Sequence, residues 1–235
     1  THNTMINKEN ILFCIVGLFG GVIIGFMFAN SMNQKAMLQA GQANQQMAGL
    51  PSGHPNIGDT QGGSIPEVQA AIDTARAEPQ NFDAQIKAAE MYYQIQRFDG
   101  AVEFLEQARK IKPDDYNTIV NLANAYFDSN KYEEAEKTYQ LAIEKKPDDI
   151  NVRTDLGLTY VFRPNPDYEK AIKEFNGALE KNPNHIQALQ NLTVAYTKKG
   201  DAANATATLA RLKTADATNS AIAKLQSDIE KIGQN

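Results

Sequence analysis

The feature that most constrains the fold of this chain is an internal repeat with a period of 34 to 36 residues. Three types of residue recur at this spacing, in columns of tyrosine, alanine and proline. The tyrosines are Tyr92, Tyr126, Tyr160 and Tyr196; the alanines are Ala101, Ala135, Ala171 and Ala205; the prolines are Pro113, Pro147 and Pro183. Repetition at this period predicts a stack of helical hairpins rather than a domain built around one central core.

The second repeat shows why each unit should fold as two packed helices. Its apolar stripes are Leu122, Ala123 and Tyr126 on the first helix, and Ala135, Tyr139 and Ala142 on the second. Spacings of three, four and seven residues predict one buried face on each helix. The alanines allow the two helices to approach closely, and the tyrosine ring fills the space between them. Pro147 then ends the second helix, and the two aspartates after it can cap the next one.

These residues resemble the tetratricopeptide repeat family over roughly residues 66–235. The matching positions are Ala88, Ala89, Tyr92, Ala101, Leu105, Ala108 and Pro113 in the first repeat, and Leu156, Gly157, Tyr160, Ala171, Phe175, Ala178 and Pro183 in the third. The resemblance implies an all-α, right-handed α-solenoid of about four helix hairpins with flanking helices. The expected units are a leading helix over 66–78, repeats over about 82–113, 116–147, 150–183 and 186–217, and a capping helix over 219–233.

The turn between the two helices of the third repeat is longer than the others by two residues. It contains Pro164 and Pro166, and each proline keeps the residue before it out of the helical region. Such a turn is either a tolerated surface insertion or a rigid knob that docks a partner.

An uncharged segment near the amino terminus, Ile11–Ala29, predicts a membrane anchor. Its 19 residues would span about 28 Å as a helix, close to the thickness of a bilayer's hydrocarbon core. We expect residues 1–10 to form a tail and residues 11–30 to form one uncleaved transmembrane helix rather than a signal peptide. Residues 31–65, rich in Gln, Asn and Gly, are expected to form a linker whose first half is compatible with a helix.

Small residues recur every four positions along the expected anchor, at Gly17, Gly21, Gly25 and Ala29. A strip of this kind lets another transmembrane helix approach closely, which would permit homo- or hetero-association, although glycine is common in such helices without any packing role. Lys8 and Lys35 lie on opposite sides of the anchor, so flanking charge discriminates little between orientations. The short tail favours a cytoplasmic amino terminus, with the repeats in the periplasm of a bacterium.

The composition of the repeat region excludes some classes of ligand. The chain has 23 Lys and Arg and 28 Asp and Glu, and two of each precede residue 66, which leaves 21 basic and 26 acidic residues. This net charge of −5 argues against nucleic acid as a partner. The three histidines and the single cysteine show no ligand spacing, and no phosphate loop or nucleophile motif occurs. We therefore expect no enzyme activity, no cofactor and no metal site.

The family resemblance also implies where a protein partner would bind. In this family the first helix of each repeat lines a groove, and its expected contact residues here are Asp83, Glu90, Tyr93, Asn117, Asn124, Phe127, Asn151, Leu158, Phe162, Gln187 and Gln190. Aromatic rings among amides suit an extended peptide or a helix. Family members that clamp a terminal carboxylate use lysine and arginine, whereas this face has Ile86, Glu90 and Asn151 at those places.

Two functions follow from the anchor and the groove together. The first is a membrane-anchored scaffold that recruits or assembles partner proteins, in which the groove carries the activity. The second is an accessory structural subunit of a multi-subunit membrane complex, docked through the strip that begins at Gly17.

Overall fold

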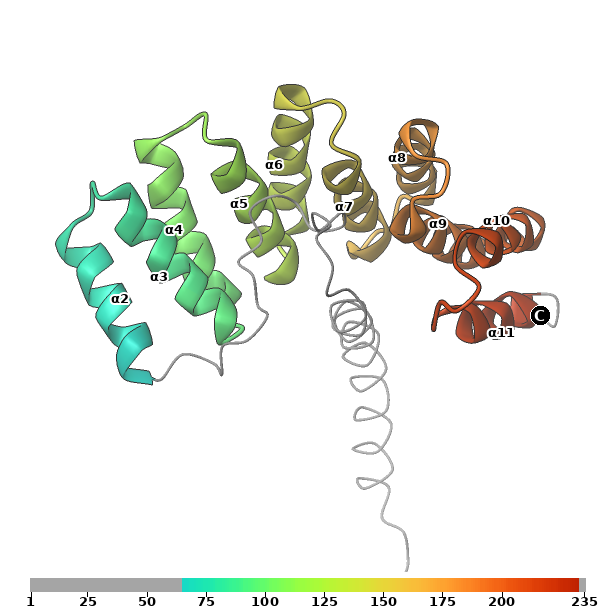
Figure 1. Ribbon diagram of the computed structural model, residues 1–235, viewed down its shortest axis with the longest axis horizontal. Coiled ribbons are helices and arrows are strands. Elements are labelled where there is room, and N and C mark those ends of the chain that lie inside the picture. The colour runs from blue at the N-terminus through green and yellow to red at the C-terminus, as the bar shows by residue number, and fades with distance from the viewer. Residues whose placement is uncertain (1–64, 233–235) are drawn as a thin grey trace, which may run out of the picture. The chain divides into compact units, whose positions relative to one another are not determined.

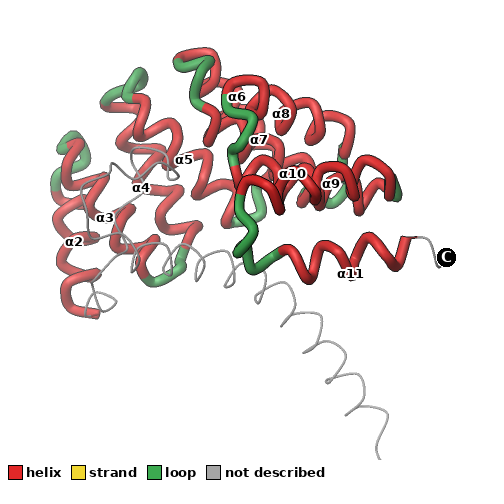
Figure 2. The backbone as a smooth tube through the Cα atoms, turned by 45° about the vertical axis from the view of Figure 1, so that its right-hand side comes forward, coloured by secondary structure: helices red, strands yellow, loops and turns green. Residues whose placement is uncertain are grey.

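The computed structural model of the protein describes residues 65–232. Among these residues the structure has ten α-helices and no strand, and Figure 2 shows the helices joined by short loops. The helices are α2 (Ile65–Ala77), α3 (Phe82–Gln94), α4 (Phe98–Ile111), α5 (Tyr116–Asp128), α6 (Tyr132–Lys145), α7 (Ile150–Phe162), α8 (Tyr168–Lys181), α9 (Ile186–Lys199), α10 (Ala202–Ala215) and α11 (Ile222–Ile232). The predicted all-α fold is confirmed for this part of the chain.

The helices form a stack in which each one packs against the previous and the next, as Figure 1 shows from α2 to α11. The first helices of successive hairpins also touch, since α7 contacts both α5 and α9. The second helices α6 and α8 contact each other less than these first helices do. The first helices therefore lie on the inner side of the curved stack, as expected for a solenoid. The predicted right-handed twist stays a prediction.

None of the described helices combines the length and the apolar composition needed to cross a membrane. The predicted anchor over residues 11–30, its strip of small residues and the predicted linker all lie outside the described residues.

The repeated columns provide the core of the stack. All four alanines of the alanine column are completely buried, which lets the paired helices approach closely. Tyr160 of the tyrosine column is also buried, whereas the other three tyrosines are half-buried. The buried apolar residues form two clusters, and α5 contributes Leu122 to one and Ile119 to the other. Because α5 contributes to both clusters, the core extends along the stack rather than gathering at one centre. Burial of each large apolar side chain stabilises the fold by about 1.5–3 kcal/mol.

The aspartate pairs that follow Pro113 and Pro147 act as helix caps and ion pairs. The second aspartate of each pair, Asp115 or Asp149, accepts backbone N–H bonds at the start of α5 or α7, as predicted. The first of each pair instead binds a lysine at the end of the hairpin that follows: Asp114 lies 2.6 Å from Lys145 on α6, and Asp148 lies 2.6 Å from Lys181 on α8.

The turns inside the hairpins explain the long turn of the third repeat. Four residues after the tyrosine column, Gln96, Asn130 and Gly200 have φ angles of 57°, 60° and 83°. The next residue then donates its backbone N–H to the column tyrosine's carbonyl oxygen. The equivalent position in the third repeat is Pro164, whose ring forbids a positive φ. The chain there takes two extra residues, and Asp167 makes the same closing bond to Tyr160 at 2.9 Å.

We expect the left-handed turn positions to control local stability. Gly200→Ala should lower the free energy of unfolding by about 1 kcal/mol, because alanine rarely adopts this conformation. An added Cβ would meet nothing within 4 Å, so steric overlap does not contribute. Gln96→Gly should raise the free energy of unfolding by up to about 1 kcal/mol. Urea unfolding followed by circular dichroism measures both changes, and an unchanged Gly200→Ala protein would contradict the explanation.

Candidate partner-binding groove

All of the predicted contact residues lie on the first helices of the hairpins, α3, α5, α7 and α9. Asp83 and Asn117 are exposed, and Glu90, Leu158, Gln187 and Gln190 are half-buried. The structure brings two predicted aromatics together: the rings of Phe127 on α5 and Phe162 on α7 meet edge to face with centroids 6.1 Å apart. This pair forms an apolar surface that bridges two repeats.

Hydrogen bonds tie the inner face together from one repeat to the next. The Tyr93 hydroxyl on α3 donates to the Asp128 carboxylate at the end of α5. The Tyr116 hydroxyl donates to Asp149 at 2.7 Å, and Asn151 and the His185 Nε2 atom lie 3.1 Å apart. Each of these pairs joins residues 33 to 35 positions apart, about one repeat. The inner face is therefore held in one arrangement before any partner binds, which reduces the entropy cost of binding.

Asn124 has a structural role that the sequence does not reveal. The residue is only 5% exposed, and its Oδ1 atom accepts a hydrogen bond from the buried Tyr139 hydroxyl at 2.6 Å. Tyr139 lies on α6, so this bond joins the two helices of the second hairpin. Asn124 thus satisfies a buried phenol, and its predicted contact with a partner stays a prediction.

A concavity opens between α3, α4 and α5. Its lining residues are Ile86, Ala89, Glu90, Tyr93, Leu105, Asn121 and Asn124. Three of these were predicted as contact residues from the sequence, and Asn121 was not. The Oδ1 atom of Asn121 is one of two buried side-chain atoms within residues 65–232 that have no hydrogen-bond partner. An acceptor in this state favours a ligand that can donate a hydrogen bond.

Two inner-face carboxylates titrate far from their ordinary range. Burial raises the pKa of Asp128 to about 6, although the bond from Tyr93 opposes that rise. Burial, together with the nearby charges of Asp149 and Asp128, raises the pKa of Asp155 to about 7. Sequence reasoning did not single out Asp155. Its position four residues after Asn151 on one helix could have revealed it, because that spacing places both on one face.

We expect Asp155 to make the protein less stable as the pH rises. A carboxyl whose pKa is raised by folding stabilises the fold below its unfolded pKa of about 4, and this contribution disappears as the pH passes through 7. Asp155→Asn should therefore raise the free energy of unfolding at pH 8 by about 1–2 kcal/mol and change it little at pH 4. Urea unfolding at the two pH values measures the difference. An equal effect at both would contradict the raised pKa.

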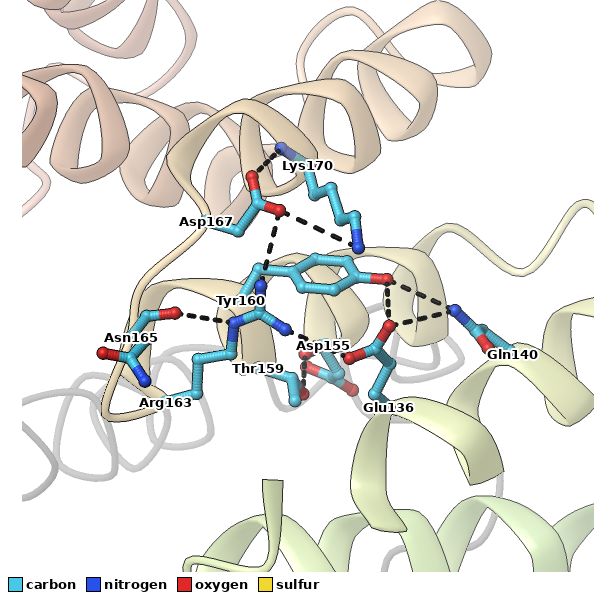
Figure 3. A network of polar contacts seen from close by, with 9 residues as sticks. All are labelled: Glu136, Gln140, Asp155, Thr159, Tyr160, Arg163, Asn165, Asp167 and Lys170. Carbon is cyan, nitrogen blue, oxygen red and sulfur yellow. Dashed lines mark hydrogen bonds and ion pairs between the residues drawn. The ribbon is translucent and has the colours of Figure 1, made fainter. Parts of the chain in front are cut away.

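The long turn of the third repeat is fastened to the preceding hairpin by the network in Figure 3. The Arg163 guanidinium lies 3.3 Å from Glu136 on α6 and 3.4 Å from Asp167, and its Nε atom donates to the Asn165 carbonyl oxygen at 2.9 Å. The Tyr160 hydroxyl also bonds Glu136, and the pKa of Tyr160 is raised to about 12, chiefly by burial. The tip of the turn, residues 164–166, is exposed.

No group of three or more His, Cys, Asp or Glu side chains within residues 65–232 is arranged to hold a metal ion. The inner face offers instead aromatic rings, amides and carboxylates, which are groups that bind peptides through hydrogen bonds and apolar contact.

Two family models, both described as tetratricopeptide repeat, match the chain. One matches residues 96–154 and 166–229, and the other matches residues 64–116. The break in the first match includes the start of the long turn. No curated protein sequence matches the chain.

Several solved structures have the same fold. A crystal structure of the MamA protein is 22% identical, with a TM-score of 0.57, and the alignment covers 67% of this chain and 83% of that one. The crystal structure of YrrB, described as a TPR protein with an unusual peptide-binding site, is 16% identical with a TM-score of 0.60, covering 69% and 85%. A second MamA crystal structure is 21% identical with a TM-score of 0.54, covering 72% and 90%.

Proposed function

The chain belongs to the tetratricopeptide repeat family, and from this premise we propose that it is a membrane-anchored scaffold that recruits or assembles partner proteins at the membrane. The helical repeats bind the partner along their inner face. The segment at residues 11–30 holds the protein at the membrane, with the amino terminus in the cytoplasm and the repeats in the periplasm of a bacterium.

The observation that carries this proposal is the aromatic pair Phe127–Phe162 on the fixed inner face. Both rings are half-buried, so each retains surface that a partner can cover. Rings held on rigid helices lose little freedom on binding, and aromatic residues contribute much of the energy of protein interfaces. YrrB, which shares the fold, is described as having a peptide-binding site. An extended peptide or a helix suits a groove of this kind.

Anchoring is proposed from the sequence of residues 11–29, which has no charged side chain. The first test is to wash membranes from cells that express the full chain with alkaline carbonate. Retention in the membrane supports the anchor, and release into the wash contradicts it. Protease treatment of intact spheroplasts then tests the orientation, since periplasmic repeats should be digested and cytoplasmic repeats should be protected.

Recruitment through the groove is tested by comparing two variants in native membranes. The first combines Tyr93→Ala with Phe162→Ala, and the second replaces residues 11–29 with an unrelated apolar helix. A scaffold predicts that co-purifying proteins are lost from the first variant and kept by the second. The opposite pattern would favour the alternative function, an accessory subunit docked on a membrane complex through Gly17, Gly21, Gly25 and Ala29.

A further inference from the structure

Two carboxylates at the centre of the inner face have no cationic partner within the described part of the chain. The ion pairs of residues 65–232 use carboxylates elsewhere, such as Glu136, Glu174 and Glu169, and none includes Asp128 or Asp155. Asp128 receives only the Tyr93 hydroxyl. Close carboxylates without a cation repel each other, so these two favour a positively charged group from outside the protein.

The charged and titratable groups around this pair leave its charge uncompensated. Asp155 interacts with Asp149 and with the phenols of Tyr93, Tyr116 and Tyr139, all of which are acidic groups. The pKa of His185, which bonds Asn151, is lowered by burial.

The nearby basic residues are already engaged or lie apart from the pair. Lys87 and Arg153 are the only basic residues of α3, α5 and α7. Arg153 binds Glu174 at 2.7 Å, and Lys87 is exposed. Lys146 lies over the Tyr116 ring, and Arg163 binds Glu136 and Asp167. Among the described residues, no ion pair therefore includes Asp128 or Asp155.

The surroundings of the two carboxylates fit a long cationic side chain rather than a bare ion. The Phe127 ring meets the rings of Phe162 and Tyr132, and Tyr132 interacts with the Asp128 carboxylate, so an apolar surface adjoins the charge. Tyr93, the phenol bound to Asp128, also lines the concavity that contains Asn121, whose Oδ1 atom has no partner in the described residues. Lysine and arginine have an apolar stem for the rings and several N–H donors for carboxylates and an amide oxygen.

We propose that the centre of the groove, between α3, α5 and α7, binds a lysine or arginine side chain presented by an extended segment of the partner protein. This inference rests on the proposed function and specifies the chemistry of its partner. The charge preference is opposite to that of family members that clamp a terminal carboxylate with basic residues. Charge complementarity selects the partner, and the aromatic pair supplies contact area.

The pH dependence of binding follows from the same groups. A bound cation favours the ionised form of Asp155 and Asp128, whose pKa values in the free protein are about 7 and about 6. Lowering the pH from 8 to 5 protonates both, so the affinity for a basic peptide should fall across this range. High salt should also weaken binding, because dissolved ions screen the attraction between the carboxylates and the basic residue.

The test is an unbiased selection of random 12-residue peptides against the full chain in detergent, followed by titration of synthetic versions of the enriched peptides. We expect enriched peptides to contain lysine or arginine. Their affinity should fall about 30-fold on Asp155→Asn and when their basic residue is replaced by norleucine. Asp114→Asn is the matched control, because this exposed carboxylate binds Lys145 and lies outside the groove.

The outcomes separate this inference from the proposed function. Peptides that lose affinity on Phe162→Ala but keep it on both Asp155→Asn and Asp128→Asn would overturn the cation site while supporting groove binding. Enriched peptides that are neutral or acidic would also overturn it, as would a selection that enriches no peptide. Peptides whose affinity is unchanged by all three substitutions would contradict both the cation site and the groove.

Discussion

We expect Gly157→Ala to lower the free energy of unfolding by about 2–3 kcal/mol. A Cβ atom at this position would lie 2.4 Å from the Phe175 Cε1 atom, and two further ring atoms lie within 2.9 Å. The Phe175 ring is completely buried between α7 and α8, so it has no free space into which to move. Helices α7 and α8 would have to separate, although alanine favours a helix more than glycine does. Urea unfolding of the full chain measures the change.

Gly177→Ala is the matched control for this substitution. Gly177 also lies within a helix, and the nearest atom to its added Cβ is Cδ of the Arg153 side chain at 3.1 Å. That side chain is flexible and can shift by a few tenths of an ångström, so helix propensity should leave stability unchanged or raise it by up to about 1 kcal/mol. Equal losses from the two substitutions would show that close packing on Phe175 is not the cause.

We expect Phe175→Ala to lower the free energy of unfolding by about 3–5 kcal/mol. The ring is among the largest completely buried side chains of the described residues, and its removal leaves a cavity where the third repeat joins its neighbours. Phe162→Ala provides the comparison, because that ring is half-buried on the inner face and should cost much less. Similar losses for the two rings would contradict the assignment of one to the core and the other to the groove.

A double substitution tests whether Gly157 and Phe175 are in direct contact. Phe175→Leu shortens the side chain that meets the added methyl group, so Gly157→Ala should cost less in that background than in the natural chain. Stability losses that simply add would contradict direct contact between the two positions, because independent sites add and touching sites do not.

The fold could be predicted from the sequence because each repeat applies the same local rules. The alanine column predicted close helix packing, and those alanines are buried in the structure. The aspartates after the prolines predicted helix caps, and Asp115 and Asp149 have that role. The long third turn was visible as two extra residues. Its cause lies in the backbone, because Pro164 occupies the position that has a positive φ in the other three hairpins.

The inner face was less predictable, because periodicity gives the direction of a side chain but not its partner. Asn124 faces inward at the predicted register, yet Tyr139 from the paired helix takes its oxygen. Asp155 was missed because a carboxylate at the edge of the stripe resembles ordinary solvent-exposed charge. Its raised pKa arises from burial and from the nearby charges of Asp149 and Asp128. Neither burial nor those neighbours can be derived from the sequence of one helix. Hydrogen bonds between repeats, such as the one from Tyr93 to Asp128, cannot be predicted from the periodicity of a single helix either.

Site-specific photo-crosslinking in living cells tests most directly whether this protein binds a partner along its inner face. A photoreactive amino acid is placed at Leu158 on α7 in one variant and at the exposed Glu103 on α4 in another. Inner-face binding predicts a discrete crosslinked protein from position 158, which Phe162→Ala removes, and none from position 103. A crosslinked protein from position 103 alone would show that partners bind the outer helices, and it would contradict the groove as the functional surface.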